Sequence, residues 1–219
     1  MLVFQNVSKK YGDKVILEDI DLHIKAGEFV YLTGPSGAGK STLLSLILRE
    51  QVPDLGTILV DSVDISKIKN SQVYKLRRKV GFVFQDYRLL PTKNSFENIS
   101  IALEIIGKKR KQIKKRVEEL LKLVGLEDRI YNFPWQLSGG EKQRLAIARA
   151  MALEPKIIIA DEPTGNLDAS NSWEILNLLN RLNQELGTTT LLATHDLNLV
   201  KNLKKRTLHL EGGRITEHD

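Results

Sequence analysis

The sequence contains no cysteine and no long apolar run. The absence of cysteine excludes disulfide bonds and thiolate metal sites, and it is compatible with a reducing cytoplasm. The longest apolar stretches, such as the one between Leu43 and Leu48, are too short to form a helix that crosses a bilayer. Residues 1–30 mix charges with alternating apolar positions, which is not the pattern of a signal peptide. We therefore expect a cytoplasmic protein.

Positive charge is in small excess, with 33 Lys and Arg against 27 Asp and Glu, and it is concentrated in one segment. Residues 108–111 and 114–116 are all Lys or Arg. One interpretation is a solvated helix face. Another is attraction to anionic lipid headgroups, which contributes about 1 kcal/mol for each cation near the surface. Nucleic acid is not expected as a partner, because no aromatic residues alternate with these cations.

A chain of 219 residues can bury a sizeable core, and one domain with an inserted subdomain is expected. Strand patterns alternate with helical patterns, which favours an α/β fold with a mostly parallel sheet. We expect an α/β core with a β subdomain in 1–85 and 153–219, and an inserted helical subdomain in 86–152. The predicted strands are 2–7, 16–24, 29–33, 57–60, 80–85, 156–161, 190–194 and 206–210.

Helices are predicted from apolar residues that recur at helical spacing. The helix between the strands predicted at 156–161 and 190–194 is expected to end at Gly187, which would be its C-cap. Gly212-Gly213 indicates a hairpin. The predicted helices are 42–50, 110–124 and 142–151, together with one whose apolar stripe is Ile175, Leu176, Leu179, Leu182 and Leu186.

A glycine-rich loop lies between a compact apolar strand and a helix. Its glycines allow successive backbone N–H groups to point at phosphate oxygens, and the helix adds its positive N-terminal end. We expect Lys40 to reach the β- and γ-phosphates of a nucleotide and Ser41 to ligate Mg²⁺ through its hydroxyl. The residues of this predicted nucleotide site are Gly34, Pro35, Ser36, Gly37, Ala38, Gly39, Lys40, Ser41 and Thr42.

Two carboxylates follow a later apolar strand at 156–161. Asp161 is well placed to hold Mg²⁺ through its water shell, and Glu162 can orient or deprotonate the attacking water. Without the phosphate loop, an ordinary acidic strand end would be the better interpretation. A general base of this kind accelerates a reaction by about 10²–10⁴-fold, so Glu162 predicts hydrolysis as well as binding.

Residues 137–141, Leu-Ser-Gly-Gly-Glu, form a second glycine-rich helix start. Ser138 and Glu141 have the spacing of a capping box. A helix N-terminus with two glycines and a serine hydroxyl is a candidate anion site. The alternative is a well-capped helix whose glycines serve a turn, and the physical argument leaves both interpretations open.

Residues 137–144, Leu-Ser-Gly-Gly-Glu-Lys-Gln-Arg, resemble the signature of the ABC-transporter ATPases, and the resemblance extends over essentially the whole chain. It implies a P-loop NTPase (RecA-like) core, an N-terminal antiparallel β subdomain and an inserted helical subdomain. It also implies a homodimer that forms on ATP binding. In that dimer Ser138, Gly139 and Gly140 would bind the γ-phosphate held by the phosphate loop of the other subunit.

The resemblance assigns four further positions, and each has a plainer alternative. Tyr11 would stack on adenine, or it is simply an exposed tyrosine at a strand end. Gln85 would bind Mg²⁺ and sense the attacking water, or it is a polar strand end. Asp168 would lie in a loop that crosses the dimer interface, or it is the N-cap of the next helix. His195 would contact the γ-phosphate as a catalytic switch, although a lone histidine is usually structural.

Residues 76–91 narrow the resemblance to the cell-division ATPases of this family. This implies a protein that is peripheral on the inner face of the cell membrane and acts on an integral partner with four transmembrane helices. Through that partner it would control the activators of septal peptidoglycan hydrolases. Ser62 and residues 94–98 depart from the usual pattern, and the second segment lies near the surface expected to contact the partner.

Other functions stay open at this point. The ATPase of a lipoprotein-release or macrolide-export system shares the same overall architecture. A relative that acts on DNA or ribosomes would normally carry two ATPase units or a long coiled-coil insert, and this chain has neither. A scaffold that binds ATP without hydrolysis would normally lack Glu162, Gln85 or His195, and all three are present.

Overall fold

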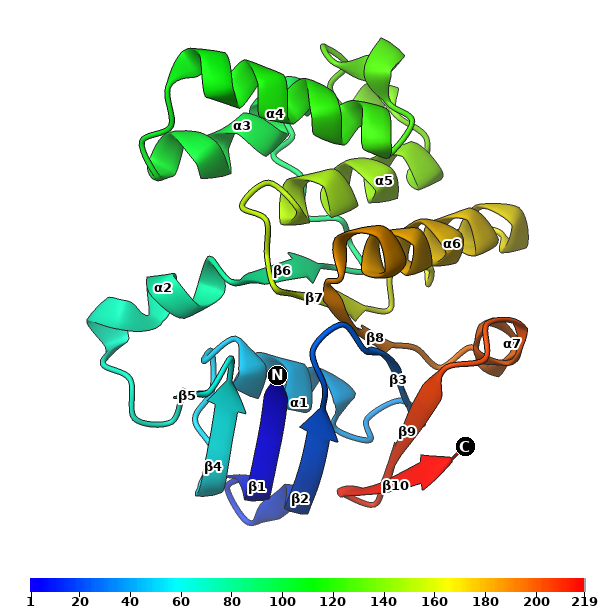
Figure 1. The fold of residues 1–219 in the computed structure, drawn as a ribbon. Helices are drawn as coiled ribbons and strands as arrows, with labels where there is room; N and C mark the ends of the chain where they lie inside the picture. Colours follow the sequence, from blue (N-terminus) through cyan, green and yellow to red (C-terminus); the bar gives the residue numbers. More distant parts are fainter. Residues whose placement is uncertain (219) are drawn as a thin grey trace.

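The structure, a computed structural model, describes residues 1–218, in which ten strands form two β-sheets (Figure 1). The strands are β1 (Leu2–Tyr11), β2 (Lys14–Ile24), β3 (Phe29–Thr33), β4 (Leu55–Val60), β5 (Val63–Asp64), β6 (Val80–Val83), β7 (Ile157–Asp161), β8 (Thr189–Ala193), β9 (Arg206–Glu211) and β10 (Arg214–His218). The smaller sheet is antiparallel, with the order β2-β1-β4-β5. The larger has the order β10-β9-β3-β8-β7-β6, and all its pairings except β10 with β9 are parallel.

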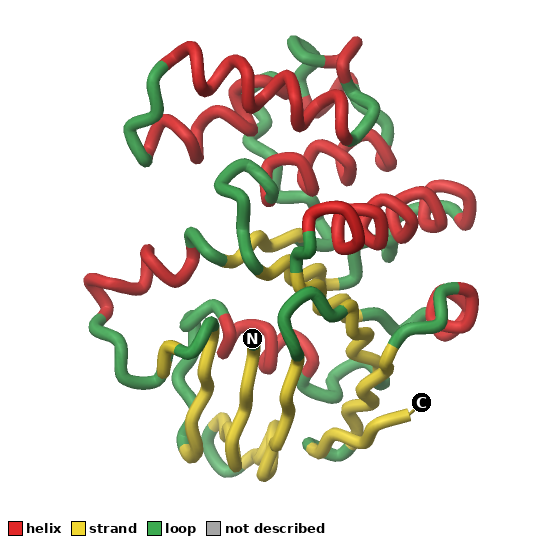
Figure 2. The backbone as a smooth tube through the Cα atoms, viewed as in Figure 1, coloured by secondary structure: helices red, strands yellow, loops and turns green. Residues whose placement is uncertain are grey.

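The α-helices gather mainly on one side of the larger sheet, as the red segments of Figure 2 show. None of the helices described within residues 1–218 is long and apolar enough to cross a membrane. The α-helices are α1 (Lys40–Ile47), α2 (Val73–Arg77), α3 (Ser95–Ile105), α4 (Arg110–Leu123), α5 (Gly139–Ala150), α6 (Ala169–Leu186) and α7 (Leu197–Asn202). The 3₁₀ helices are η1 (Asn70–Gln72), η2 (Glu127–Arg129) and η3 (Pro134–Gln136).

The larger sheet separates two hydrophobic cores. Successive side chains of a strand point to opposite faces, so Ile157 and Ile159 of β7 pack with α1 and the smaller sheet. Ile158 and Ala160 pack with the helices α3, α4, α5 and α6 on the other face. Residues 157–160 of β7 are buried and all apolar, as in strands of covered parallel sheets, and only Asp161 at its end is polar. The two glycine-rich helix starts therefore belong to opposite layers, since α1 lies in one core and α5 in the other.

The predicted α/β fold class is confirmed, with an antiparallel N-terminal sheet, a mostly parallel larger sheet and a block of helices. Residues 110–124 place their apolar stripe in the core as expected. The short elements η1, α2 and β5 were not predicted, because two to five residues do not establish a periodic pattern.

Several predicted boundaries and one predicted buried residue were wrong. The strand predicted to end at Gln85 ends at Val83, because the backbone turns there into a loop with left-handed residues. The helix predicted to begin at residue 142 begins at Gly139, since the capping box closes before it. Leu186, expected in the buried stripe of α6, is 52% exposed because it is the last residue of the helix.

A buried amide joins the end of α6 to two strands of the larger sheet. Asn183 is 6% exposed, and its Nδ2 donates to the carbonyl of Gly27 at 2.9 Å and to that of Thr188 at 2.6 Å. α6 then ends at Gly187, which takes the left-handed φ of 64° common at helix C-termini. Thr188 immediately precedes β8 and Gly27 lies two residues before β3, so Asn183 ties together the segments that lead into both strands.

We expect Asn183→Ala to lower the free energy of unfolding by about 2 kcal/mol, because it leaves a buried carbonyl without its partner. Asn177→Ala, on the exposed face of the same helix, is the matched control and should change stability by less than about 0.5 kcal/mol. Urea unfolding followed by circular dichroism measures both values. Equal effects of the two substitutions would contradict the role given to Asn183.

Candidate active site

The loop between β3 and α1 is shaped by glycines. Gly34, Gly37 and Gly39 have φ values of 146°, 79° and 106°, a region that other residues rarely adopt. A side chain at Gly34 is also excluded by space, since its Cβ would lie 2.2 Å from the carbonyl oxygen of Leu210 in β9. The loop therefore rests directly on the backbone of β9.

Lys40, the first residue of α1, is held over this loop. Its side chain is 6% exposed, and its Nζ donates to the carbonyls of Gly34 at 2.7 Å and Pro35 at 3.1 Å. The same Nζ lies 3.9 Å from Oε1 of Glu162. A buried ammonium needs such partners because burial without them is strongly unfavourable. Its position lets it meet the phosphates of a nucleotide bound in the loop.

Glu162 follows β7 and sits between two basic groups. Its carboxylate is near Lys40 through Oε1, and its Oε2 lies 3.1 Å from Nδ1 of His195, the second residue after β8. Its backbone N–H donates to the carbonyl of Ala193 at 2.9 Å. Its φ of 46° is left-handed, which is unfavourable for a residue with a side chain and is found preferentially at functional sites.

Asp161 is the other carboxylate at the end of β7. Burial raises its pKa, and the nearby charge of Glu162 raises it further. A hydrogen bond with the Ser41 side chain and the charges of Lys40 and Arg88 act in the opposite direction, but the net shift is upward. Desolvation disfavours the charged form of a carboxyl group. The site thus holds a negative charge at a position where the folded chain alone does not stabilise it.

These groups line one cavity of 290 Å³. Ammonium, hydroxyl, carboxylate and amide groups meet there, from the phosphate loop, the end of β7 and the segment after β6. A second cavity of 400 Å³ lies beside it and shares Glu162 with it. The residues lining the first cavity are Ile16, Ser36, Gly37, Gly39, Lys40, Ser41, Thr42, Gln85, Asp161 and Glu162.

Gln85 is held by the segment that follows Glu162. Its carbonyl accepts a hydrogen bond from Nδ2 of Asn166 at 3.1 Å. A Cβ on Gly165 would lie 2.8 Å from Nε2 of Gln85, so the glycine there leaves room for the glutamine side chain. Gln85 thereby reaches the cavity although it lies beyond the end of β6.

The loop after Gln85 is held in a strained shape by α5. Tyr87 and Arg88 have left-handed φ values of 62° and 45°, which neither residue type favours. The guanidinium of Arg149, in the last turn of α5, donates to the carbonyls of Tyr87 at 2.8 Å and Arg88 at 2.5 Å. One end of α5 therefore fixes the loop that carries Gln85.

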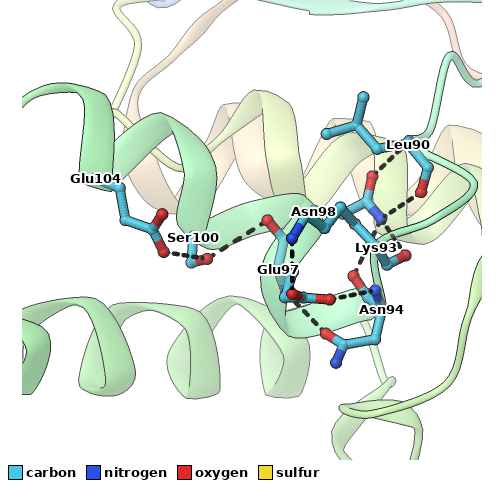
Figure 3. A network of polar contacts seen from close by, with 7 residues as sticks. All are labelled: Leu90, Lys93, Asn94, Glu97, Asn98, Ser100 and Glu104. Carbon is cyan, nitrogen blue, oxygen red and sulfur yellow. Dashed lines mark hydrogen bonds and ion pairs between the residues drawn. The ribbon is translucent and has the colours of Figure 1, made fainter.

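A second anchor ties the far end of this loop to α3 (Figure 3). Asn98 is fully buried. Its Oδ1 accepts from the N–H of Leu90 at 2.8 Å, and its Nδ2 donates to the carbonyls of Leu90 at 3.2 Å, Lys93 at 2.8 Å and Asn94 at 3.0 Å. α3 begins at the same place, capped by Asn94 and Glu97. The loop between Gln85 and α3 is thus fastened at both ends.

The other end of α5 carries the second glycine-rich motif. Ser138 caps the helix, since its side chain accepts from the N–H of Glu141 at 3.2 Å while Glu141 accepts from the N–H of Ser138 at 2.8 Å. Arg129 pairs with Glu141 at 3.0 Å, and both contacts lower the pKa of Glu141. This is the predicted capping box.

The glycines of this motif pack against the start of α6. A Cβ on Gly140 would lie 2.4 Å from Oδ1 of Asn171. Asp168 is the N-cap of α6 and accepts hydrogen bonds from the backbone and side chain of Asn171 at 2.9 and 2.6 Å. Packing within the chain is therefore one reason for a glycine at position 140, in addition to any contact with a phosphate.

The predicted site residues fall into two groups. One group lines the 290 Å³ cavity and comprises Ser36, Gly37, Gly39, Lys40, Ser41, Thr42, Gln85, Asp161 and Glu162. His195 lies against Glu162, while Gly34, Pro35 and Ala38 belong to the same loop but are not among the lining residues. The other group, Ser138, Gly139, Gly140 and Asp168, lines no part of that cavity among the described residues. Tyr11 ends β1 and is 46% exposed, and the paired strand β2 supplies Ile16 to the cavity.

Comparisons with known proteins agree on one family. A family described as ABC transporter matches residues 17–165, more than half of the chain. The chain is 49% identical over 220 residues to the cell division ATP-binding protein FtsE of Streptococcus pneumoniae serotype 2 (strain D39 / NCTC 7466), covering 100% of this chain and 95% of that protein. It is 47% identical to FtsE of Bacillus subtilis (strain 168), covering 100% and 96%. The chain belongs to the ABC transporter ATPase family.

Two further similarities extend this assignment. The methionine import ATP-binding protein MetN 1 of Bacillus thuringiensis subsp. konkukian (strain 97-27) is 44% identical, over 99% of this chain and 65% of that protein. A solved dimeric structure of the ATP-binding cassette MJ0796, in a post-hydrolysis state bound to ADP and Pi, has 39% identity and a TM-score of 0.89, covering 100% of this chain and 98% of the other. The chain is thus an ABC-type ATPase, which binds and hydrolyses ATP.

The donor set at the end of β7 suits magnesium in this ATPase. Within residues 1–218 no group of three or more His, Asp or Glu side chains forms a metal site. Mg²⁺ typically takes only one or two protein ligands and completes its shell with water and substrate phosphates. The hydrogen-bonded pair of Ser41 and Asp161 offers a hydroxyl and a carboxylate oxygen beside the phosphate loop. This small number of protein ligands matches the coordination that Mg²⁺ prefers.

Several residues that support the site of this ATPase were not predicted from the sequence. Arg149 holds the loop after Gln85, Asn98 anchors the same loop, and Asn171 covers Gly140. An Asn inside the apolar pattern of α3 was a signal for Asn98, because a buried amide needs partners. Arg149 and Asn171 gave no such signal, because their partners lie on other elements.

We expect Asp161→Asn to raise the thermal unfolding midpoint of the nucleotide-free ATPase at about pH 7. The pKa of Asp161 is higher in the folded chain than in the unfolded chain. At a pH above both pKa values, the charged carboxylate therefore lowers the stability of the folded chain. The neutral amide removes this penalty. Differential scanning fluorimetry checks the sign.

The same experiment at about pH 3 is the control. Asp161 is then largely protonated in both the folded and the unfolded chain, so the difference between the unfolding midpoints of the two proteins should shrink. A midpoint that falls for Asp161→Asn at neutral pH would contradict the prediction.

Proposed function

We propose that the chain acts as a homodimer that closes around two ATP molecules, each held between the phosphate loop of one subunit and residues 138–140 of the other. The observation that carries this proposal is the separation of the two phosphate-type motifs. The loop 34–42 and the capped start of α5 belong to opposite layers of the fold. None of the described residues that line the cavity comes from 137–141, so a second copy is needed to complete the site.

Each group at the cavity then has a distinct task. The backbone N–H groups of residues 34–39 and the ammonium of Lys40 bind the phosphates, and closure adds the N-terminal end of the partner's α5 on the far side. Glu162 accepts a proton from the attacking water, and His195 holds Glu162 and contacts the γ-phosphate. Positioning and electrostatic stabilisation of the transferred group provide most of the catalysis.

The remaining predicted residues complete the site. Tyr11 stacks on the adenine ring from the end of β1, and Asp168 lies at the surface that meets the other subunit. Ser41, Asp161 and Gln85 would hold Mg²⁺, which would supply positive charge against the charge that develops on the phosphates. Loss of the γ-phosphate removes the group that joins the two subunits, and they separate.

We further propose that this ATPase works on an integral membrane partner of the FtsX type, with four transmembrane helices. The similarity to FtsE over the whole chain supports a cell-division role. In that role the ATPase sits on the inner face of the membrane and controls, through its partner, the activators of septal peptidoglycan hydrolases.

The partner's docking site is proposed next to the loop that follows Gln85. A groove of 340 Å³ lies there, which we call the arginine groove because Arg77, Arg78, Arg88 and Arg149 line it together with apolar residues such as Phe82. The guanidinium groups of this groove favour a partner segment that carries carboxylates. Since Arg149 also holds the loop of Gln85 through the carbonyls of Tyr87 and Arg88, we infer that a change at the nucleotide reaches this groove through few contacts.

A trapped variant tests both parts of the proposal. Glu162→Gln should keep ATP binding, lower turnover by about a hundredfold or more, and accumulate as an ATP-bound dimer in size-exclusion chromatography. Purified from membranes with ATP, it should carry a four-helix integral protein with a large extracytoplasmic loop, identified by mass spectrometry. Glu185→Gln, at an exposed acid near the end of α6 that does not line the cavity, is the matched control and should behave as the wild type.

The outcomes separate the alternatives. Turnover that is unchanged in Glu162→Gln would refute the catalytic proposal. A trapped dimer that carries a lipoprotein-handling, drug-export or methionine-import membrane protein would keep the catalytic proposal and replace the cell-division role.

The role of residues 138–140 needs a test that separates phosphate contact from packing. Gly140→Ala alone introduces a methyl group against Asn171, so it is combined with Asn171→Ala to make room within the chain. The double variant should bind ATP normally, yet fail to dimerise and lose turnover by about a hundredfold, as removal of one oxyanion-binding group does.

Asn171→Ala alone is the control and should retain dimerisation. If the double variant regained full turnover and dimer formation, the glycine would serve only the packing of α5 on α6. ATP binding by fluorescence titration and dimerisation by light scattering give the two measurements.

A further inference from the structure

The turn between α3 and α4 concentrates the positive charge of this protein. Residues 104–119 hold seven Lys or Arg and three Glu, in a chain whose net charge is only +6. Lys108, Lys109, Arg110 and Lys111 are all exposed, and Figure 1 shows this turn at the outer end of the helical block. We call residues 105–115 the basic tip.

The order of charges along α4 does not serve the stability of the helix. Cations occupy its first turn, where no acidic residue is found, although the positive end of a helix disfavours them. The carboxylates Glu118 and Glu119 come later, pairing with Lys114 at 3.8 Å and Lys115 at 3.9 Å. The four cations of residues 108–111 are therefore presented outward at an energetic cost. A residue that breaks a local rule in this way points to a functional demand.

Apolar groups accompany these cations at the surface. Ile105, the last residue of α3, is 72% exposed, and so is Tyr131. Tyr131 and Phe96 line a groove of 670 Å³ together with Lys108, Arg110 and Lys114. Exposed aliphatic and aromatic side chains beside Lys and Arg are typical of surfaces that lie in the interfacial region of a membrane.

The basic tip also borders the proposed docking site of the membrane partner. A cavity of 380 Å³ that includes Lys108 and Lys115 shares Leu153 with the arginine groove, and their α3 residues, Leu103 and Ala102, are neighbours in the chain. In Figures 1 and 2 the α3–α4 turn and α2, whose last residue Arg77 lines the arginine groove, lie on the same side of the molecule. A partner seated in the arginine groove would bring the tip toward the bilayer that contains it.

We propose that the basic tip is a lipid-contact surface, which binds the anionic phospholipid headgroups that surround the membrane partner, with Ile105 at the level of the headgroups. This inference rests on the proposed assembly with a membrane partner. The cations at the start of α4 are attracted to an anionic surface. The carboxylates of Glu118 and Glu119 lie about two turns further along α4, where such a surface repels them less. Each cation near such a surface contributes on its own, so the four of residues 108–111 act together.

A bilayer fits these groups better than nucleic acid does. Single-stranded nucleic acid is bound by aromatic side chains that stack between the cations, and residues 108–116 contain none. Ile105 offers an aliphatic group that a phosphate backbone does not use. A flat anionic surface uses both kinds of group.

Vesicle flotation of the purified full-length chain, without the partner, tests this proposal. The chain should float with vesicles that contain about 30% phosphatidylglycerol at about 50 mM salt, but not with pure phosphatidylcholine, and about 0.5 M salt should release it. The variant Lys108→Gln, Lys109→Gln, Lys111→Gln should partition about a hundredfold more weakly. Ile105→Ser should weaken binding several-fold at either salt concentration.

The matched control is Lys25→Gln, Lys69→Gln, Lys204→Gln, which removes the same charge from exposed sites on other elements. It should bind anionic vesicles within about threefold of the wild type, since its cations are outside the tip. No variant should have a lower unfolding midpoint or a lower ATP turnover than the wild type, because the changed side chains are exposed and lie outside the cavity.

Three results would overturn the proposal. They are a wild-type chain that ignores anionic vesicles, equal losses in the tip and control variants, and a tip-dependent affinity for single-stranded oligonucleotides in place of vesicles. Each is independent of the Glu162→Gln experiment. Capture of a membrane partner without vesicle binding would reject only the lipid surface, and vesicle binding without a captured partner would reject only the proposed assembly.

Discussion

The contact of Glu162 with Lys40 on one side and His195 on the other is the interaction on which the site depends. It joins the phosphate loop, the end of β7 and the end of β8 at 3.9 and 3.1 Å. The three segments meet because their strands are parallel neighbours whose carboxyl ends share one edge of the sheet. Asn183 ties together the segments that lead into the opposite ends of β3 and β8, so the register of the sheet determines the geometry of the catalytic groups.

The helix α5 connects the loop that carries Gln85 with the surface on which the second glycine-rich motif lies. Its first residues form the capped glycine motif, and Arg149 in its last turn holds the strained loop after Gln85. A rigid helix of twelve residues is about 18 Å long. A single element therefore links the surface proposed to meet the second subunit with the groove proposed to meet the membrane partner. Coupling between the two sites follows from the stiffness of one helix and needs no longer chain of contacts.

Motifs whose geometry is local could be predicted from the sequence. The phosphate loop, the capping box at Ser138 and the acidic end of β7 each depend on residues close together in the chain, and all three lie where they were expected. Contacts between elements could not be predicted. The proximity of Asn171 to Gly140 depends on how α6 packs on α5, and the end of β6 at Val83 depends on a loop held by Arg149. The Asp168 side chain caps α6, which is the plainer of its two interpretations.

The close approach of Gly34 to Leu210 has a consequence for the order of synthesis. The phosphate loop is made early, but the backbone that supports it belongs to β9, which follows every helix of the protein. The sheet neighbours of β3 on both sides, β8 and β9, also come late in the chain. A nascent chain that has completed α1 through α6 therefore has its phosphate-binding residues but not their support. Nucleotide affinity should therefore appear only after β9 has been synthesised and has paired with β3, so that ATP binds to chains that are already folded.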